Sequence, residues 1–153
     1  MKEEKRQAGK AVQLVTFVLG GDEYGVDIKD VHEVIVMQKI TKLPNLPAYI
    51  EGVVNLRGKV IPIIDLRKHF NLPYKDDPGQ MKIIVVEINN MLLGLIVNSI
   101  GKVLTVLLED ITPSPVRVSG IGSEYVKGIG NIGGNLLLIL DLKKIFIEEI
   151  KLQ

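Results

Sequence analysis

The stretch Asn55–Leu66, NLRGKVIPIIDL, is echoed further along the chain by Asn131–Leu142, NIGGNLLLILDL. Each copy begins with Asn, has Gly three residues later, continues through an apolar run and ends in Asp-Leu. A Gly-containing turn between apolar runs is typical of a β-hairpin. The stretch therefore predicts one hairpin made twice, each time followed by an Asp that can cap a helical turn.

The repeat extends beyond these two stretches. An ungapped alignment of Gly52–Phe70 with Gly128–Phe146 covers nineteen positions, of which eight are identical. The identical pairs are Gly52/Gly128, Asn55/Asn131, Gly58/Gly134, Ile63/Ile139, Asp65/Asp141, Leu66/Leu142, Lys68/Lys144 and Phe70/Phe146. Upstream, TFVLGGDEYGVDI matches VVEINNMLLGLIV in pattern, with Gly25 against Gly94. We therefore predict two repeated β units, with turn-forming roles for Asn55, Gly58, Asn131 and Gly134.

Short runs of Val, Ile and Leu bounded by turn residues predict strands along most of the chain. The clearest are residues 11–19, 24–28, 59–64, 81–88, 91–97 and 136–140. Residues 29–37 fit either helical or strand spacing. Leu66–Phe70, after the potential cap Asp65, and the closing run 141–153 predict helices.

Three segments rich in Pro or Gly, residues 43–50, 71–80 and 111–128, predict irregular connections. The hairpins on either side of them favour two small β-barrels over a parallel βαβ sheet. We expect one domain over residues 11–150, with barrels at about 11–80 and 81–150 and an exchange of strands between them left open. Neither half is large enough to be very stable alone, so a shared core is expected.

The composition excludes several kinds of site. The net charge of +1, from 19 basic and 18 acidic residues, provides no basic surface for nucleic acid. Cys is absent, which excludes disulfides, Cys-based zinc sites and a thiol nucleophile. No apolar run approaches the roughly 18 residues of a membrane helix. The start MKEEKRQAGK, residues 1–10, lacks a secretory signal's apolar segment, so we expect a disordered charged tail on a cytoplasmic protein.

Enzyme chemistry has little support in the sequence. GIGNIG, Gly128–Gly133, fits G-x-G-x-x-G, but a strand follows it instead of the helix N-terminus that would hold a pyrophosphate. His32 and His69 lie in unrelated segments, and neither has an obvious set of a carboxylate and a nucleophile with which it could act in catalysis. Both are expected at the surface. We predict a protein that is not an enzyme and has no metal or cofactor. A nucleotide-binding domain and a nucleic-acid-binding barrel are the alternatives.

Arg57 and Glu33 are candidate contact residues. Arg57 lies at a hairpin tip where the repeat has Gly133, so the turn itself does not require Arg. From the residues alone, a solvated turn residue or a local salt bridge is the favoured interpretation of Arg57, although Arg is enriched at binding hot spots. Glu33, flanked by Val31 and Val34, fits an interface rim or an ordinary amphipathic segment.

The ordered segments EYGVDI, VHEVI and LPNLPAYIEGVVNLRGKVIPIIDLR resemble the CheW family, the coupling proteins of bacterial chemotaxis. GLIVNSIGKVL, ITPSPV and YVKGIGNIGGNLLLILDL match the same family in the same order, so the resemblance covers about residues 13–147. It implies two five-stranded SH3-like β-barrels around a common core, with short helical turns, a C-terminal helix and no catalysis.

The resemblance also implies partners. Proteins of this family bind the regulatory domain of the chemotaxis histidine kinase and the signalling tip of methyl-accepting chemoreceptors. We therefore expect a cytoplasmic adaptor, recruited to membrane receptor arrays, with no nucleic acid, no small-molecule substrate and no membrane insertion. A scaffold in another chemosensory pathway, such as pilus-based motility, is the alternative.

Two groups of contact residues follow from the resemblance. Receptor binding is associated with Val31, Glu33, Arg57 and Val103. Kinase binding is associated with one edge of the first barrel and with a P-x-P loop of the second, here Met37, Ile40, Lys42, Pro113, Pro115, Val116 and Arg117. An amphipathic receptor hairpin needs an apolar groove, and an apolar fraction of 46% leaves residues for one.

Overall fold

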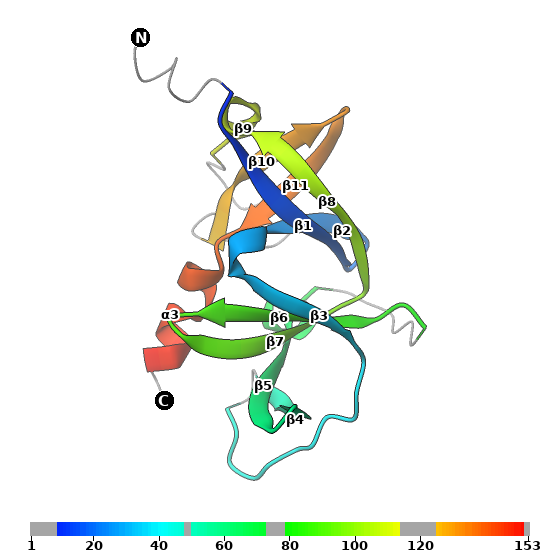
Figure 1. Ribbon diagram of the computed structural model, residues 1–153, viewed down its shortest axis with the longest axis vertical. Coiled ribbons are helices and arrows are strands. Elements are labelled where there is room, and N and C mark those ends of the chain that lie inside the picture. The colour runs from blue at the N-terminus through cyan, green and yellow to red at the C-terminus, as the bar shows by residue number, and fades with distance from the viewer. Residues whose placement is uncertain (1–8, 48–49, 73–78, 114–124, 152–153) are drawn as a thin grey trace. The chain divides into compact units, whose positions relative to one another are not determined.

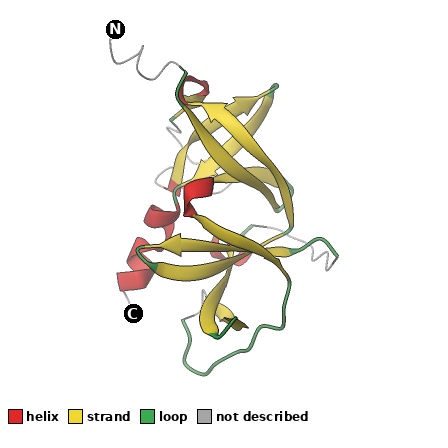
Figure 2. Cartoon of the chain, in the orientation of Figure 1, coloured by secondary structure: helices red, strands yellow, loops and turns green. Residues whose placement is uncertain are grey.

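The computed structural model describes residues 9–47, 50–72, 79–113 and 125–151, with side chains described as far as Phe146. The expected charged tail, residues 1–10, lies almost wholly outside the described residues. The elements are β1 (Ala11–Leu19), β2 (Asp22–Asp27), η1 (Ile28–Asp30), β3 (Val31–Val36), β4 (Ile50–Leu56), β5 (Lys59–Asp65), α2 (Leu66–His69), β6 (Lys82–Ile88), β7 (Met91–Val97), β8 (Ser99–Leu107), η2 (Leu108–Asp110), β9 (Ile111–Thr112), β10 (Val126–Ile132), β11 (Asn135–Leu140) and α3 (Leu142–Lys151) (Figure 1). Strands dominate (Figure 2), and the predicted mainly β fold is confirmed.

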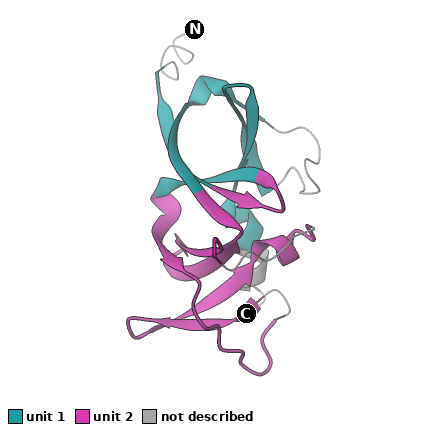
Figure 3. Ribbon diagram, turned by 90° about the vertical axis from the view of Figure 1, so that its right-hand side faces the viewer, with its two compact units in different colours: residues 1–16, 23–28, 101–153 teal, residues 17–22, 29–100 magenta. Residues whose placement is uncertain are grey.

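The chain divides into two compact units, each built from separate segments (Figure 3). Unit 1 consists of residues 1–16, 23–28 and 101–153, and unit 2 of residues 17–22 and 29–100. Residues 81–100 of the second half thus group with segments of the first half.

Each sheet combines strands from both halves of the repeat. One sheet has the order β8-β1-β2-β11-β10-β9 and the other β3-β6-β7-β5-β4. In the first, β2 runs parallel to β11, with Gly25 opposite Ile139. In the second, β7 runs parallel to β5, with Gly94 opposite Ile63. These are equivalent pairings in the two copies of the repeat.

The first sheet has a sixth strand beyond the predicted five. β9 has two residues, of which Ile111 pairs with Gly130 of β10 and Thr112 with Ile129. The predicted connection 111–128 was therefore wrong at both of its ends. The close approach depends on Gly128, because a Cβ atom there would lie 2.9 Å from the carbonyl oxygen of Thr112.

The second sheet has a shorter version of the same contact. Thr41 and Val53 form an isolated bridge with two backbone hydrogen bonds, both of 2.9 Å. A Cβ atom on the neighbouring Gly52 would lie 2.5 Å from the carbonyl oxygen of Thr41. The repeated glycines Gly52 and Gly128 therefore share one role: they let a second segment approach the hairpin strand.

The two repeated hairpins have the same turn. Arg57 and Gly58 have φ angles of +51° and +86°, and Gly133 and Gly134 have φ angles of +57° and +89°. Two successive positive φ angles define a type I′ turn, whose twist matches that of paired strands. The hairpin connection of β4 to β5 is therefore equivalent to that of β10 to β11.

An Asn side chain supports each turn. Asn55 Oδ1 accepts a hydrogen bond from the Gly58 N–H at 2.9 Å, and Asn131 Oδ1 accepts one from the Gly134 N–H at 3.1 Å. The repeated Asn-x-x-Gly motif is thus a local hydrogen-bonded unit that stabilises the turn and sets the hairpin register.

The ambiguous segment 29–37 is resolved as part of a 3-10 turn followed by β3. β3 pairs antiparallel with β6, and its residues alternate between half-buried and exposed. This alternation is the pattern of a strand with one face toward the core. Pairing with a strand from the other half of the chain thus decided the conformation.

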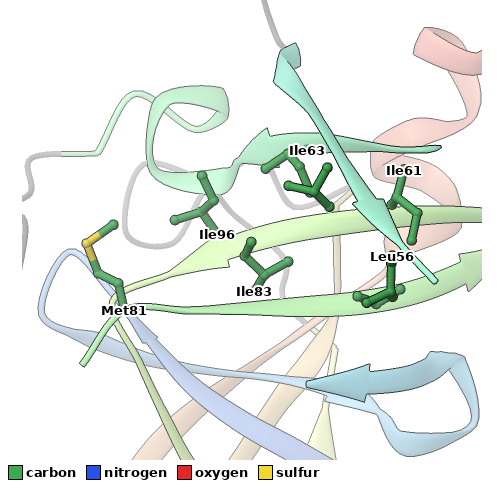
Figure 4. Packing of buried hydrophobic residues seen from close by; sticks show 8 residues of the cluster. Leu56, Ile61, Ile63, Met81, Ile83 and Ile96 are labelled. Atoms are coloured by element: carbon green, nitrogen blue, oxygen red, sulfur yellow. The ribbon is translucent and has the colours of Figure 1, made fainter. Parts of the chain in front are cut away.

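Each unit has its own cluster of buried apolar side chains. In unit 2 the cluster comprises Val54, Leu56, Ile61, Ile63, Met81, Ile83, Val85 and Ile96, which come from β4 to β7 and the residue before β6 (Figure 4). In unit 1 it comprises Leu14, Val106, Leu137 and Ile139. Burying one such side chain contributes about 1.5–3 kcal/mol. Each cluster combines side chains from both halves of the chain.

Candidate functional site

The candidate site lies on unit 2, where the β4–β5 turn meets β3. Arg57 Nη2 donates a hydrogen bond to Glu33 Oε1, and Nη1 donates one to Oε2 at 3.4 Å. The arrangement is bidentate, the geometry in which a guanidinium recognises a carboxylate best. The side chain of Arg57 is 68% exposed and that of Glu33 is 26% exposed. The guanidinium is therefore accessible to a partner while one carboxylate orients it.

The path of the chain explains how these residues meet. β3 and β4 are the two edge strands of the five-stranded sheet. In β3, Val31 pairs with Val86 and Glu33 with Val85, so His32 is the extra residue of a bulge. A bulge increases the local twist and changes the direction of nearby side chains. The ion pair therefore links two edges of one sheet, as the Thr41–Val53 bridge also does.

Arg57 has a backbone conformation that is unfavourable for its side chain. Its φ of +51° lies in the left-handed region, which costs a residue other than Gly about 1 kcal/mol. Gly133 takes the same conformation in the other hairpin without this cost. An unfavourable conformation at an exposed position suggests a role for Arg57 outside folding.

Electrostatics keep both groups charged. The hydrogen bond from Arg57 lowers the pKa of the Glu33 carboxyl below its ordinary value; partial burial opposes this shift, and the charges of Arg57 and His32 add to it. Glu33 raises the pKa of Arg57 through the same hydrogen bond and through its charge. The pair is therefore ionised throughout the neutral pH range.

The other predicted receptor residues lie on two different strands. Val31 is half-buried at the start of β3, two residues before Glu33. Val103 is on β8 within unit 1, and its side chain is 54% exposed. The structure thus brings Glu33 and Arg57 into contact, with Val31 on the same strand as Glu33, while Val103 is an exposed apolar residue of the other unit.

Two of the predicted kinase residues have a structural role. Met37 and Ile40 are half-buried and pack against the core cluster of unit 2. Lys42 is exposed and lines a pocket of about 330 Å³ together with Leu43, Asn45, Leu46, Pro47, Ile50 and Glu51. A change at Met37 or Ile40 would therefore alter the core as well as the surface, whereas Lys42 can be changed alone.

The P-x-P loop is described only at its first residue. Pro113 is exposed and follows β9 directly. Pro115, Val116 and Arg117 lie outside the described residues. The contact predicted for this loop therefore rests on the sequence.

The structure adds exposed apolar residues that we did not predict as site residues. Val34 and Val36 are 41% and 63% exposed on the edge strand β3, and Val60 is 64% exposed beside the Arg57 turn. Exposed apolar side chains on an edge strand are a common feature of surfaces that receive a partner. The apolar run Val34–Val36 was the available signal, but an edge strand is identified only by its pairing.

The described residues contain no cluster of three or more His, Cys, Asp or Glu side chains that could hold a metal ion. Within the same ranges, no helix has the length and apolar character needed to cross a bilayer.

Comparisons with known proteins agree in sequence and in structure. The family model described as a CheW-like domain matches residues 13–149. Chemotaxis protein CheW of Treponema pallidum is 38% identical over 141 residues, covering 90% of this chain and 83% of the relative. Chemotaxis protein CheW of Klebsiella aerogenes is 34% identical over 144 residues, covering 93% and 87%.

A solved structure is also similar. The scaffolding protein TtCheW of Thermoanaerobacter tengcongensis superimposes with a TM-score of 0.83 at 38% identity, covering 90% of this chain and 93% of that one. The similarity includes the architecture of two SH3-like subdomains. With a family model across the chain and relatives matched over most of their length, the chain belongs to the CheW family of chemotaxis scaffold proteins.

Proposed function

We propose that this protein is a non-enzymatic adaptor that couples a chemotaxis histidine kinase, through its regulatory domain, to the cytoplasmic tip of chemoreceptors. The observation that carries the proposal is the exposed Arg57 guanidinium, held by Glu33 at the edge of a barrel in a chain of the CheW family. In this role the protein acts in the cytoplasm at membrane receptor arrays.

The receptor site comprises Val31, Glu33, Arg57 and Val103. Arg57 supplies a preorganised charge, because the bidentate contact with Glu33 limits the orientations of a long side chain before the partner arrives. Val103 supplies exposed apolar area. A charged anchor together with apolar contacts suits an amphipathic helical partner.

The kinase site comprises the edge of unit 2 at Met37, Ile40 and Lys42, together with the loop residues Pro113, Pro115, Val116 and Arg117. The exposed Val34 and Val36 extend the edge of unit 2 along β3. The apolar residues of this edge, with Lys39 and Lys42 beside them, favour a mainly hydrophobic contact with charges at its rim.

Co-elution tests the proposal. The protein is mixed at tens of micromolar with the kinase regulatory domain and with a receptor signalling-tip fragment, each separately and both together, and analysed by size-exclusion chromatography. We expect both binary complexes and a ternary complex. If neither partner co-elutes, the adaptor function is refuted.

Two variants then distinguish the sites. Arg57→Gly should reduce receptor binding and leave kinase binding unchanged, and Lys42→Glu should do the reverse. Lys59→Ala is a matched control, since Lys59 is an exposed cation on the same hairpin with no ion pair recorded among the described residues. If either variant lost affinity for the kinase domain and for the receptor fragment to the same extent, the proposal of two separate sites would be contradicted.

A further inference from the structure

His32 contacts the same carboxylate oxygen as Arg57. Its Nε2 lies 3.8 Å from Glu33 Oε1, the oxygen that accepts a hydrogen bond from Arg57 Nη2. Consecutive residues of a regular strand point to opposite faces. His32 and Glu33 can approach each other because His32 is the extra residue of the β3 bulge. The guanidinium of Arg57 and the imidazole of His32, which is cationic only when protonated, therefore face the same carboxylate oxygen.

The strand residues paired directly with this part of β3 are uncharged. The residues of β6 opposite it, Val85 and Val86, are apolar. Among the described residues, the ion pairs of the cluster are His32–Glu33 and Arg57–Glu33. The charged side chains on the flanking elements are Lys29 and Asp30 of η1, Glu51 of β4, Lys59 and Asp65 of β5, and Lys82 and Glu87 of β6. With His32 neutral, the three side chains of the cluster carry no net charge, and protonation of His32 makes them positive.

We propose that His32 is a positioning residue for Arg57: when protonated, it shares the Glu33 carboxylate and releases the guanidinium toward a carboxylate of the binding partner. Identifying that partner as the receptor tip rests on the proposed function, whereas the linkage between His32 and Arg57 does not. Histidine side chains ordinarily titrate at about pH 6.5. Affinity for an acidic surface should therefore rise as the pH falls from about 7.5 to about 6.

The linkage is tested first in the free protein. The side-chain Nε resonance of Arg57 is followed by NMR between about pH 7.5 and about pH 6. We expect a step in the chemical shift of this resonance in the wild type and no step in His32→Gln, which keeps a polar side chain but cannot gain a proton in this range. His69→Gln is the matched control, because His69 is the other histidine of the chain, and this variant should keep the step. A wild-type resonance that does not move, or that moves equally in His32→Gln, overturns the proposal.

Binding is tested second, with a receptor signalling-tip fragment at the same two pH values. The wild type should bind about twofold to fivefold more tightly at the lower pH, in line with the small free energy of an exposed ion pair. The affinity of His32→Gln should be the same at both. A pH dependence that persists in His32→Gln overturns the positioning role. If no form binds the fragment at either pH, the proposed function is refuted, and the Arg57 resonance alone decides the linkage.

Discussion

At the scale of the residue, Arg57 and Gly133 occupy the same position of two equivalent turns. Both have positive φ angles, +51° and +57°, which Gly adopts freely and Arg does not. The fold therefore accepts Gly at this place, and only the hairpin that faces Glu33 has Arg. This comparison within one molecule separates what the turn requires from what the site requires.

Arg57→Gly should separate folding from function. The substitution relieves the left-handed strain but makes the unfolded chain more flexible, so the two effects largely cancel. We expect the melting temperature to change by less than about 3 °C. Receptor binding should weaken by about tenfold or more, as for a hot-spot residue. Differential scanning fluorimetry and a titration with the receptor tip measure the two effects. A large loss of stability with binding intact would show that Arg57 is structural.

The titration of Glu33 should report the ion pair directly. Because Arg57 lowers the pKa of this carboxyl, the pair is fully formed above the ordinary carboxyl pKa of about 4.3 and is lost as the pH falls through the lowered value. Carbon-detected NMR of the Glu33 carboxyl should therefore show a midpoint below that of exposed glutamates. In Arg57→Gly the midpoint should return toward the ordinary value. An unchanged midpoint in the variant would mean that the pair is not formed in solution.

At the scale of the element, Pro62 shows how the two copies diverged. Pro62 lies in β5, between β4 and β7, although Pro lacks the N–H of a central strand. Its partner on β4 is Val53, whose backbone hydrogen bonds go to Thr41. The parallel ladder to β7 begins only at Ile63, whereas the equivalent Leu138 still pairs with Tyr24. With this donor missing, the β5–β7 ladder begins one residue later than the β11–β2 ladder.

Gly94 and Gly25 occupy equivalent positions of the repeat, so Gly94→Ala and Gly25→Ala are a matched pair of substitutions. A Cβ at Gly94 would overlap the side-chain end of Ile63 and lie 2.9 Å from Ile83 Cγ2, whereas at Gly25 the nearest atom is Leu137 Cδ2 at an ordinary 3.4 Å. We expect Gly94→Ala to lower the free energy of unfolding by about 1–3 kcal/mol, and Gly25→Ala to lower it by clearly less. Urea denaturation measures both. Equal effects would contradict this difference in packing.

The buried ion pair at the start of α2 should be costly to break. Asp65 Oδ1 accepts hydrogen bonds from the Arg67 N–H and Nε at 3.0 and 2.9 Å, and Oδ2 accepts one from Nη2 at 2.8 Å. Arg67 is 1% exposed and Asp65 is 4% exposed. Asp65→Ala would leave a buried charge without its carboxylate and remove the helix cap, which should cost about 3–5 kcal/mol.

The neighbouring surface pair supplies the control for this substitution. Lys68 Nζ lies 2.8 Å from Glu51 Oε1, with the Lys68 side chain 53% exposed. Lys68→Ala should cost less than about 1 kcal/mol in the same urea experiment. Comparable losses in Asp65→Ala and Lys68→Ala would mean that burial does not set the importance of these ion pairs.

At the scale of the whole molecule, the sheets join what the sequence separates. β5 of the first half pairs with β7 of the second, and β11 of the second half pairs with β2 of the first. Each half alone therefore contains hairpins that lack their parallel partner strands. Isolated hairpins are marginally stable in water, so neither half should fold by itself.

Division of the chain within the segment 73–78 tests this expectation. Residues 1–76 and 77–153 expressed separately should give poorly dispersed amide NMR spectra, and the mixture should recover the dispersion of the intact protein. The intact chain cleaved at the same point is the control and should stay folded. A well-dispersed spectrum from either fragment alone would contradict the requirement for strands from both halves.

Much of the local structure could be predicted from the sequence. The turn at Asn55–Gly58, the cap at Asp65 and the strand 11–19 were all predicted, because each depends on neighbours within a few residues. The conformation of 29–37 could not be decided, and β9 was missed. Both depend on a distant strand that provides pairing, and Gly128 gave no indication of which segment would approach it.

The sequence by itself determined the repeated local unit: two Asn-x-x-Gly turns, their apolar strands and the Asp caps, together with the membership in the CheW family that these motifs indicated. Only the tertiary structure decided which strands pair and that Glu33 meets Arg57, 24 residues away in the chain. The physical reason is the separation along the chain of the residues that interact. A turn or a cap is closed by atoms a few residues apart, whereas the site is assembled when a curved sheet brings its two edges together.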